Sequence, residues 1–144
     1  MRPLLIACAL CSLATTANAD GFDIKLRFDD RATLTLAQIG ESVVVSALYY
    51  GDPSAKGEAH SDEMGQIWLG TEEVEVDGLN QTVHLKAALD DEGLVWIKGA
   101  LRVNINIFSA RHSDLNNLLN CAIFEDDIAV AQARTPVLRC VMLE

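Results

Sequence analysis

The sequence has no apolar run long enough to cross a membrane as a helix, which takes about 20 residues. Its longest apolar segment, Leu4–Leu13, covers only about ten positions. It also lacks internal repeats and low-complexity tracts. These absences argue against an integral helical membrane protein and against a repeat architecture.

Basic residues are scarce. The chain has 11 Lys and Arg against 21 Asp and Glu, a formal net charge of −10. Such an acidic surface repels nucleic acids and anionic lipids and favours cationic partners. The same charge would also serve simply to keep an exported protein in solution.

Motifs of common hydrolases are missing as well. The three histidines, His60, His84 and His112, form no His-x-His or His-Glu-x-x-His pattern, and no Gly-x-Ser-x-Gly is present. A Ser-His-Asp set could be drawn from Ser109, His112 and Asp114. Residues this close within one loop rarely reach triad geometry, so we expect no enzymatic activity.

The N-terminal segment has the organisation of a secretory signal peptide. Arg2 supplies a positive charge, the apolar run follows, and Ala17-Asn18-Ala19 has the small-x-small pattern read by signal peptidase. We therefore expect residues 1–19 to be a signal peptide and residues 20–144 to form a single domain. This domain would be periplasmic or secreted and would not insert into a membrane. A lipoprotein modified at Cys8 is the alternative.

Cleavage would leave only two cysteines, Cys121 and Cys140. An isolated pair in an oxidising compartment predicts one disulfide. A cysteine-based metal site would need further close ligands, which the sequence does not offer.

Alternation of apolar and polar residues predicts about eight strands. They cover residues 22–28, 33–36, 42–50, 66–76, 82–87, 94–97, 101–107 and 137–142. The segment 42–50 is apolar on both faces and predicts a covered central strand, and Asp77-Gly78 predicts a hairpin turn. Aspartates before residues 128–133 and Arg134 with Pro136 after them favour a short helix, with a strand as the alternative. The fold class is thus an antiparallel β-sandwich with one short C-terminal helix, or else a closed barrel.

The segment from Leu101 to Cys121 provides the main candidate binding site. Arg102, Asn104 and Asn106 form a polar ladder on one side of a strand, where asparagine is uncommon. The loop from Ser109 to Asn117 follows and displays Arg111, His112 and Asp114. The ladder is either a solvated sheet face or a recognition surface with directed hydrogen bonds.

Aromatic residues suggest a second contact. Tyr49 and Tyr50 border the long connection 51–65, and alternation predicts that one of them is exposed. Trp68 and Trp96 lie among apolar residues, which favours core packing.

Two acidic loops raise the possibility of calcium. Candidate ligands are Asp52, Asp62 and Glu63 in one loop and Asp90 and Asp91 in the other. No EF-hand pattern is present, and exposed acidic turns are commonly only solvated.

From these patterns we expect an exported, non-catalytic protein that binds a protein partner. The negative net charge of the protein would suit a cationic hydrolase or toxin that acts on the cell envelope. The protein would then be an inhibitor of this partner or an immunity factor against it. The alternative is a calcium-dependent or aromatic carbohydrate-binding module, and a third is a small hydrolase with dispersed residues. Nothing in the sequence specifies an oligomeric state.

Overall fold

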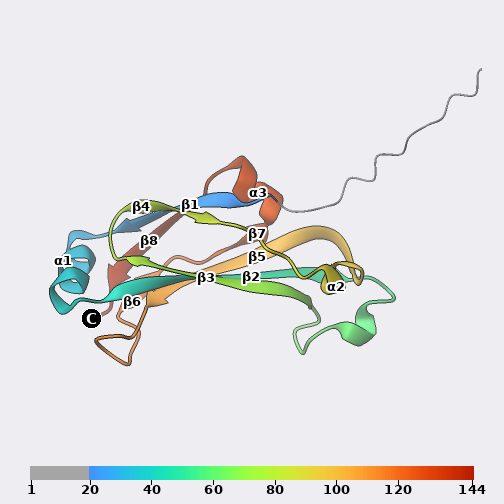
Figure 1. Cartoon of the computed structure of the whole chain (residues 1–144), viewed down its shortest axis with the longest axis horizontal. Coiled ribbons are helices and arrows are strands. Elements are labelled where there is room, and N and C mark those ends of the chain that lie inside the picture. Colours follow the sequence, from blue (N-terminus) through green and yellow to red (C-terminus); the bar gives the residue numbers. More distant parts are fainter. Residues whose placement is uncertain (1–19) are drawn as a thin grey trace, which may run out of the picture.

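The computed structural model describes residues 20–144, which form a β-sandwich of two four-stranded sheets (Figure 1). The strands are β1 (Phe22–Phe28), β2 (Ser42–Pro53), β3 (Ile67–Asp77), β4 (Gln81–Leu85), β5 (Ile97–Ser109), β6 (Leu119–Cys121), β7 (Phe124–Asp127) and β8 (Val137–Met142). The helical segments are α1 (Asp30–Ile39), α2 (Asp91–Leu94), α3 (Ile128–Ala133) and one 3-10 turn, η1 (Glu58–His60). The predicted signal peptide, residues 1–19, lies outside the described residues. None of the helices described is long and apolar enough to cross a membrane.

Sheet A has the order β4-β1-β8-β6 and sheet B the order β3-β2-β5-β7. All neighbouring strands are antiparallel except β1 and β8, which pair in parallel. The fold prediction is therefore confirmed as an all-β sandwich, with two helices more than expected.

The core lies between the two sheets because alternate residues of each strand point inward. β1 buries Phe22, Ile24, Leu26 and Phe28, as its sequence alternation predicted. β5 contributes Val103, Ile105 and Ile107 from the opposite sheet. Burying one such side chain stabilises the fold by about 1.5–3 kcal/mol.

The predicted strand at 33–36 is wrong, because this segment belongs to helix α1. The Asp29 side chain caps the helix by accepting a hydrogen bond from the Ala32 amide at 2.7 Å. Gly40 ends it in the left-handed conformation, with φ 68°. Ala32 and Leu36, four residues apart, form the buried face.

The predicted hairpin at Asp77-Gly78 is also wrong. β3 lies in sheet B and β4 in sheet A, so the turn carries the chain from one sheet to the other. Gly78 packs against helix α1: a Cβ atom there would lie 2.3 Å from Leu36 Cδ1, so a larger residue would displace the Leu36 side chain.

Other strands differ in extent. β2 buries Val43, Val45 and Ala47 on its inner face. On its outer face Leu48 is partly exposed, so the prediction that both faces are covered is wrong. β3 is continuous through Gly70, whose positive φ of 135° accommodates the irregular pairing there. The expected strand at 94–97 is replaced by α2 and the start of β5, while β6 and β7 were not predicted. The predicted helix at 128–133 is confirmed as α3.

The disulfide between Cys121 and Cys140 is confirmed. The two residues are directly opposed on β6 and β8, and Cys140 is buried. The bond therefore ties the short edge strand after the Ser109 loop to the interior of sheet A.

Candidate functional site

The outer face of sheet B brings together most of the residues predicted to bind. Arg102, Asn104 and Asn106 lie directly opposite Tyr50, Leu48 and Ser46 of β2, so all six side chains share that face. On the other side of β2, Leu48 pairs with Thr71 and Ser46 with Glu73. We call this surface the binding face; its central residues are Ser46, Leu48, Glu73, Asn104 and Asn106.

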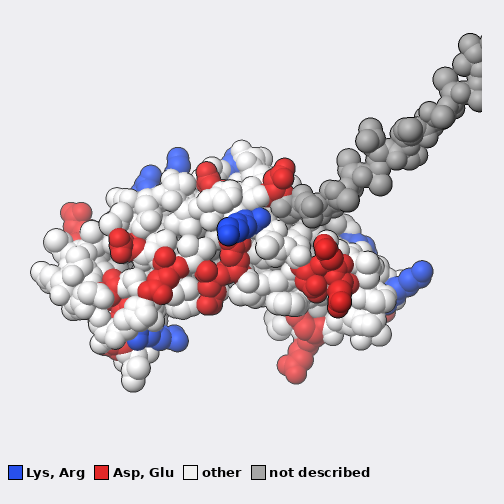
Figure 2. Space-filling view, in the orientation of Figure 1, with Lys and Arg blue, Asp and Glu red and all other residues white. Residues whose placement is uncertain are grey.

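Two loops project at opposite ends of the binding face (Figure 1). The 110–118 loop follows the end of β5, and the 54–66 loop follows the end of β2, which runs in the opposite direction. The space-filling view shows the outline of the molecule hollowed between the two projections (Figure 2). The polar ladder thus lies between two raised borders.

The 110–118 loop is held by Glu41, a residue that the sequence analysis missed. Its carboxylate accepts hydrogen bonds from the backbone amides of Ser113 at 2.7 Å and His112 at 3.2 Å. The side chain is only 5% exposed. Burial acts to raise the pKa of Glu41, but the backbone N–H groups directed at the carboxylate outweigh it and lower the pKa. The loop is therefore closed around a buried negative charge.

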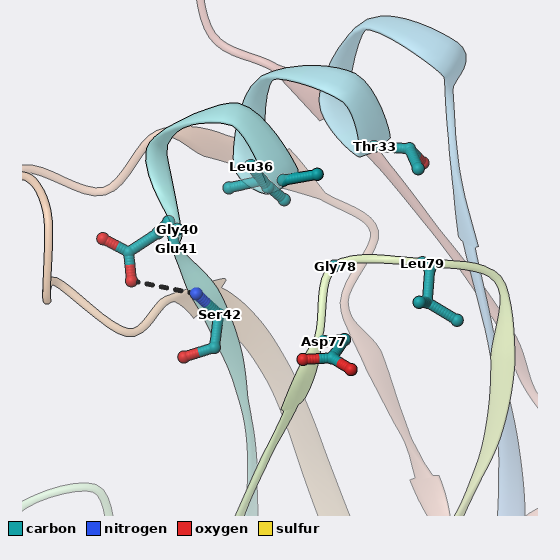
Figure 3. Close-up of a pocket in the computed structure, with 9 residues that line it drawn as sticks. Thr33, Leu36, Gly40, Glu41, Ser42, Asp77, Gly78 and Leu79 are labelled. Atoms are coloured by element: carbon teal, nitrogen blue, oxygen red, sulfur yellow. Dashed lines mark hydrogen bonds between the residues drawn. The ribbon is translucent and has the colours of Figure 1, made fainter.

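Glu41 also borders a cavity of about 390 Å³ between α1 and the turn from β3 to β4. Figure 3 shows Leu36, Gly78 and Leu79 along this cavity, whereas the Glu41 carboxylate points away from them. The carboxylate thus contacts the 110–118 loop and does not point into the cavity.

Ser109 and Asp114 are structural parts of the loop. Ser109 is fully buried, and its Oγ accepts a hydrogen bond from the Leu118 amide at 3.0 Å. Asp114 is exposed, and its Oδ1 accepts from the Asn116 amide at 2.8 Å. Ser109 is thus unavailable as the contact residue that the sequence predicted.

Arg111 and His112 remain exposed on the loop, as predicted. The Arg111 guanidinium lies 5.8 Å from the centre of the Phe108 ring. His112 Nε2 lies 2.5 Å from Glu75 Oε1, the carboxylate that also accepts a hydrogen bond from Ser42 Oγ. The loop is in this way joined to β3, at the border of the binding face.

This contact affects both titrating groups. The hydrogen bond from Ser42, followed by that from His112, lowers the pKa of Glu75. The hydrogen bond to Glu75 raises the pKa of His112. Ser42, His112 and Glu75 are not arranged as a catalytic triad. Ser42 and His112 both contact the same oxygen of Glu75, whereas in a triad the histidine lies between the serine and the acid.

Neither tyrosine is exposed, which corrects the prediction. Tyr50 points to the binding face, but it is only 2% exposed, because the Arg102 guanidinium lies 5.4 Å from its ring centre. Its hydroxyl donates to Glu125 Oε1 at 2.6 Å. Burial and this hydrogen bond raise the pKa of Tyr50 to about 12. Tyr49 is fully buried and donates to Glu72 at 2.9 Å.

The polar ladder is braced by its neighbours on β7. Asn104 Nδ2 donates to Glu125 at 3.3 Å, and Arg102 Nε lies 3.7 Å from Asp127. These contacts fix the ladder residues nearest the 54–66 loop. Asn106 is exposed, and within residues 20–144 its side chain accepts a hydrogen bond only from the neighbouring Ile107 amide.

The tryptophans differ from the prediction of core packing. Trp68 is 53% exposed, and Trp96 is half-buried with its ring stacked on His60 at 4.0 Å between ring centres. Both line a cavity of about 270 Å³ at the edge of sheet B.

The acidic loop residues do not gather into a recognisable metal site. Within residues 20–144, no group of three or more His, Cys, Asp or Glu side chains is placed to hold a metal ion. Asp62 accepts from the Met64 and Gln66 amides, and Asp90 from the Glu92 amide. Calcium binding stays a prediction, which melting curves in millimolar calcium and in chelator would test: bound calcium would raise the melting temperature.

Comparison of the chain with protein-family models, with curated proteins and with solved structures gives no match.

Proposed function

We propose that this protein is exported and binds a protein partner through the binding face and the 110–118 loop. We further propose that the partner is a cationic hydrolase or toxin of the cell envelope and that binding inhibits it. The observation that carries the proposal is the convergence of the ladder residues, Arg111 and His112 on one hollowed surface between two loops.

The dimensions of the face favour a protein over a small molecule. β5 has 13 residues, which at about 3.3 Å each gives a face about 40 Å long. Four strands about 4.8 Å apart make it about 15 Å wide. The resulting area of about 600 Å², enlarged by the loops, approaches the 800 Å² or so that each protein buries in a stable complex.

The charge of the face favours a basic partner. Among the described residues, Glu73 at the centre takes part in no ion pair, and Asp127 and Glu75 each have one. The exposed Leu48 and Asn106 beside Glu73 supply apolar area and directed hydrogen bonds. Attraction between opposite charges would accelerate association, and the apolar centre would slow dissociation.

Capture of the partner from periplasmic extract, with residues 20–144 as bait, tests the proposal. Asn106→Arg together with Leu48→Arg places bulk and positive charge at the centre of the face and should abolish capture. Thr82→Arg, on the exposed side of sheet A, is the matched control and should capture the partner normally.

The loop is tested separately. Arg111→Ala with His112→Ala should weaken binding by about 1 kcal/mol or more and leave the melting temperature nearly unchanged, because both side chains are exposed. If both double variants bind the captured protein as well as the control, the binding face is the wrong surface. If the captured protein is a hydrolase and wild-type bait leaves its activity unchanged, the inhibitory function is wrong.

A further inference from the structure

We propose that the cavity between Trp68 and Trp96 is a binding site for an organic cation, a group of the alkylammonium or guanidinium class. The cavity lies at the edge of sheet B, where the start of β3 meets η1 and α2. Its lining residues are His60, Ile67, Trp68, Asp90, Glu92, Gly93 and Trp96.

The aromatic walls are held in place before any ligand binds. The Trp68 indole N–H donates to Thr71 Oγ1 at 3.3 Å, and the Trp96 ring stacks on His60 with an interplanar angle of 22°. About half of the Trp68 side chain is nevertheless exposed. A fixed indole with open surface beside a cavity of about 270 Å³ is suited to contact a flat or rounded group of a few heavy atoms.

The acidic residues around the cavity favour a positively charged ligand. Asp90 and Glu92 line it, and neither takes part in an ion pair among the described residues. Acidic side chains gather over α2 in the space-filling view (Figure 2). A cation would be attracted both by these carboxylates and by the negative faces of the indole rings.

The cation could belong to a lysine or arginine side chain of a protein or to a free quaternary ammonium compound. The chemistry that recognises them is the same: a positive charge on an indole face with a carboxylate nearby. Trp68 lies directly opposite Tyr50, so this site borders the binding face at the start of β3. Its test is nevertheless independent, because the variants and the readout differ from those used to test the proposed function.

Tryptophan emission is a specific readout, because the protein has two tryptophans and both line this cavity. The probes are choline, its neutral carbon isostere 3,3-dimethylbutan-1-ol, the N-acetyl amides of lysine and arginine, and methyl glucoside. We expect a saturable change in emission with the cations and none with the neutral isostere. Tighter binding of the amino-acid amides would identify a protein side chain as the ligand, and tighter binding of choline a free quaternary ammonium.

The variants distinguish direct contact with the bound cation from the general effect of negative charge near the cavity. Trp68→Leu keeps an apolar side chain and leaves Trp96 as reporter; it should weaken cation binding about fivefold or more. Glu92→Gln should weaken it about threefold, whereas Asp91→Asn, the same loss of charge beside the cavity but not lining it, should have a smaller effect. A response to the isostere equal to that with choline, a response to methyl glucoside alone, or no response to any cation would overturn the proposal.

Discussion

Replacement of Glu41 should destabilise the protein and release the 110–118 loop. The carboxylate is buried and accepts two hydrogen bonds from loop amides more than 70 residues away in sequence. In Glu41→Ala the amides of His112 and Ser113 lose this partner. At about 1.5 kcal/mol for each hydrogen bond to a charged group, the free energy of unfolding should fall by about 3 kcal/mol.

The expected change is large enough to measure by thermal unfolding. A domain of about 125 residues has an unfolding entropy near 0.26 kcal/mol per degree, so the melting temperature should fall by about 11 °C. Glu41→Gln retains one acceptor and should lose about half as much. Hydrogen exchange should show faster exchange of the His112 and Ser113 amides in both variants.

The exposed Glu63 is the matched control, and Glu63→Ala should change the free energy of unfolding by no more than about 0.5 kcal/mol. The pKa of Glu41 is lowered in the folded protein, so its contribution is present above the unfolded pKa and is lost as the pH falls through the folded value. The difference between wild type and Glu41→Ala should therefore shrink in acid. A Glu41→Ala protein that melts within about 2 °C of Glu63→Ala at neutral pH would refute this reasoning.

Three further predictions concern covalent and titrating groups. Replacing both Cys121 and Cys140 by alanine should lower the free energy of unfolding by about 3 kcal/mol, because the bond closes a loop with a sequence separation of 19; equal denaturant midpoints would contradict this. The pKa of His112 is raised, so its tie to Glu75 should be complete below the unfolded histidine pKa and fade as the pH rises through the folded value. In an NMR titration, Glu75→Gln should lower the pKa of His112; an unchanged titration would exclude the contact in solution. Intact mass of exported protein should correspond to a chain beginning at Asp20, and a lipid-modified mass beginning at Cys8 would rule out the predicted cleavage.

Much of the strand content could be predicted because it depends on local alternation. β1, β4 and β8 place every second residue in the core, and β5 does so from Val103 onward. This period is visible in the sequence alone. Helix α1 was missed although its signals are local too. Asp29 as N-cap and Gly40 as C-cap are typical helix boundaries, but the brief alternation of threonine and leucine between them is equally typical of a strand.

The candidate site was predictable only in part. The positions of Arg102, Asn104 and Asn106 on one side of a strand, and the exposure of Arg111 and His112, follow from period and polarity. The burial of Tyr50 does not follow, because it depends on Arg102 and Glu125 from two other strands.

The sequence by itself determined the all-β class, the short helix α3 and the pairing of Cys121 with Cys140. Only the tertiary structure decided that the chain crosses between sheets at Gly78, that β1 pairs in parallel with β8, and that Glu41 holds a loop far along the chain. The physical reason is the range of the interactions. Side-chain period and helix caps act within a few residues, whereas strand order and buried hydrogen bonds depend on which distant segments meet when the core closes.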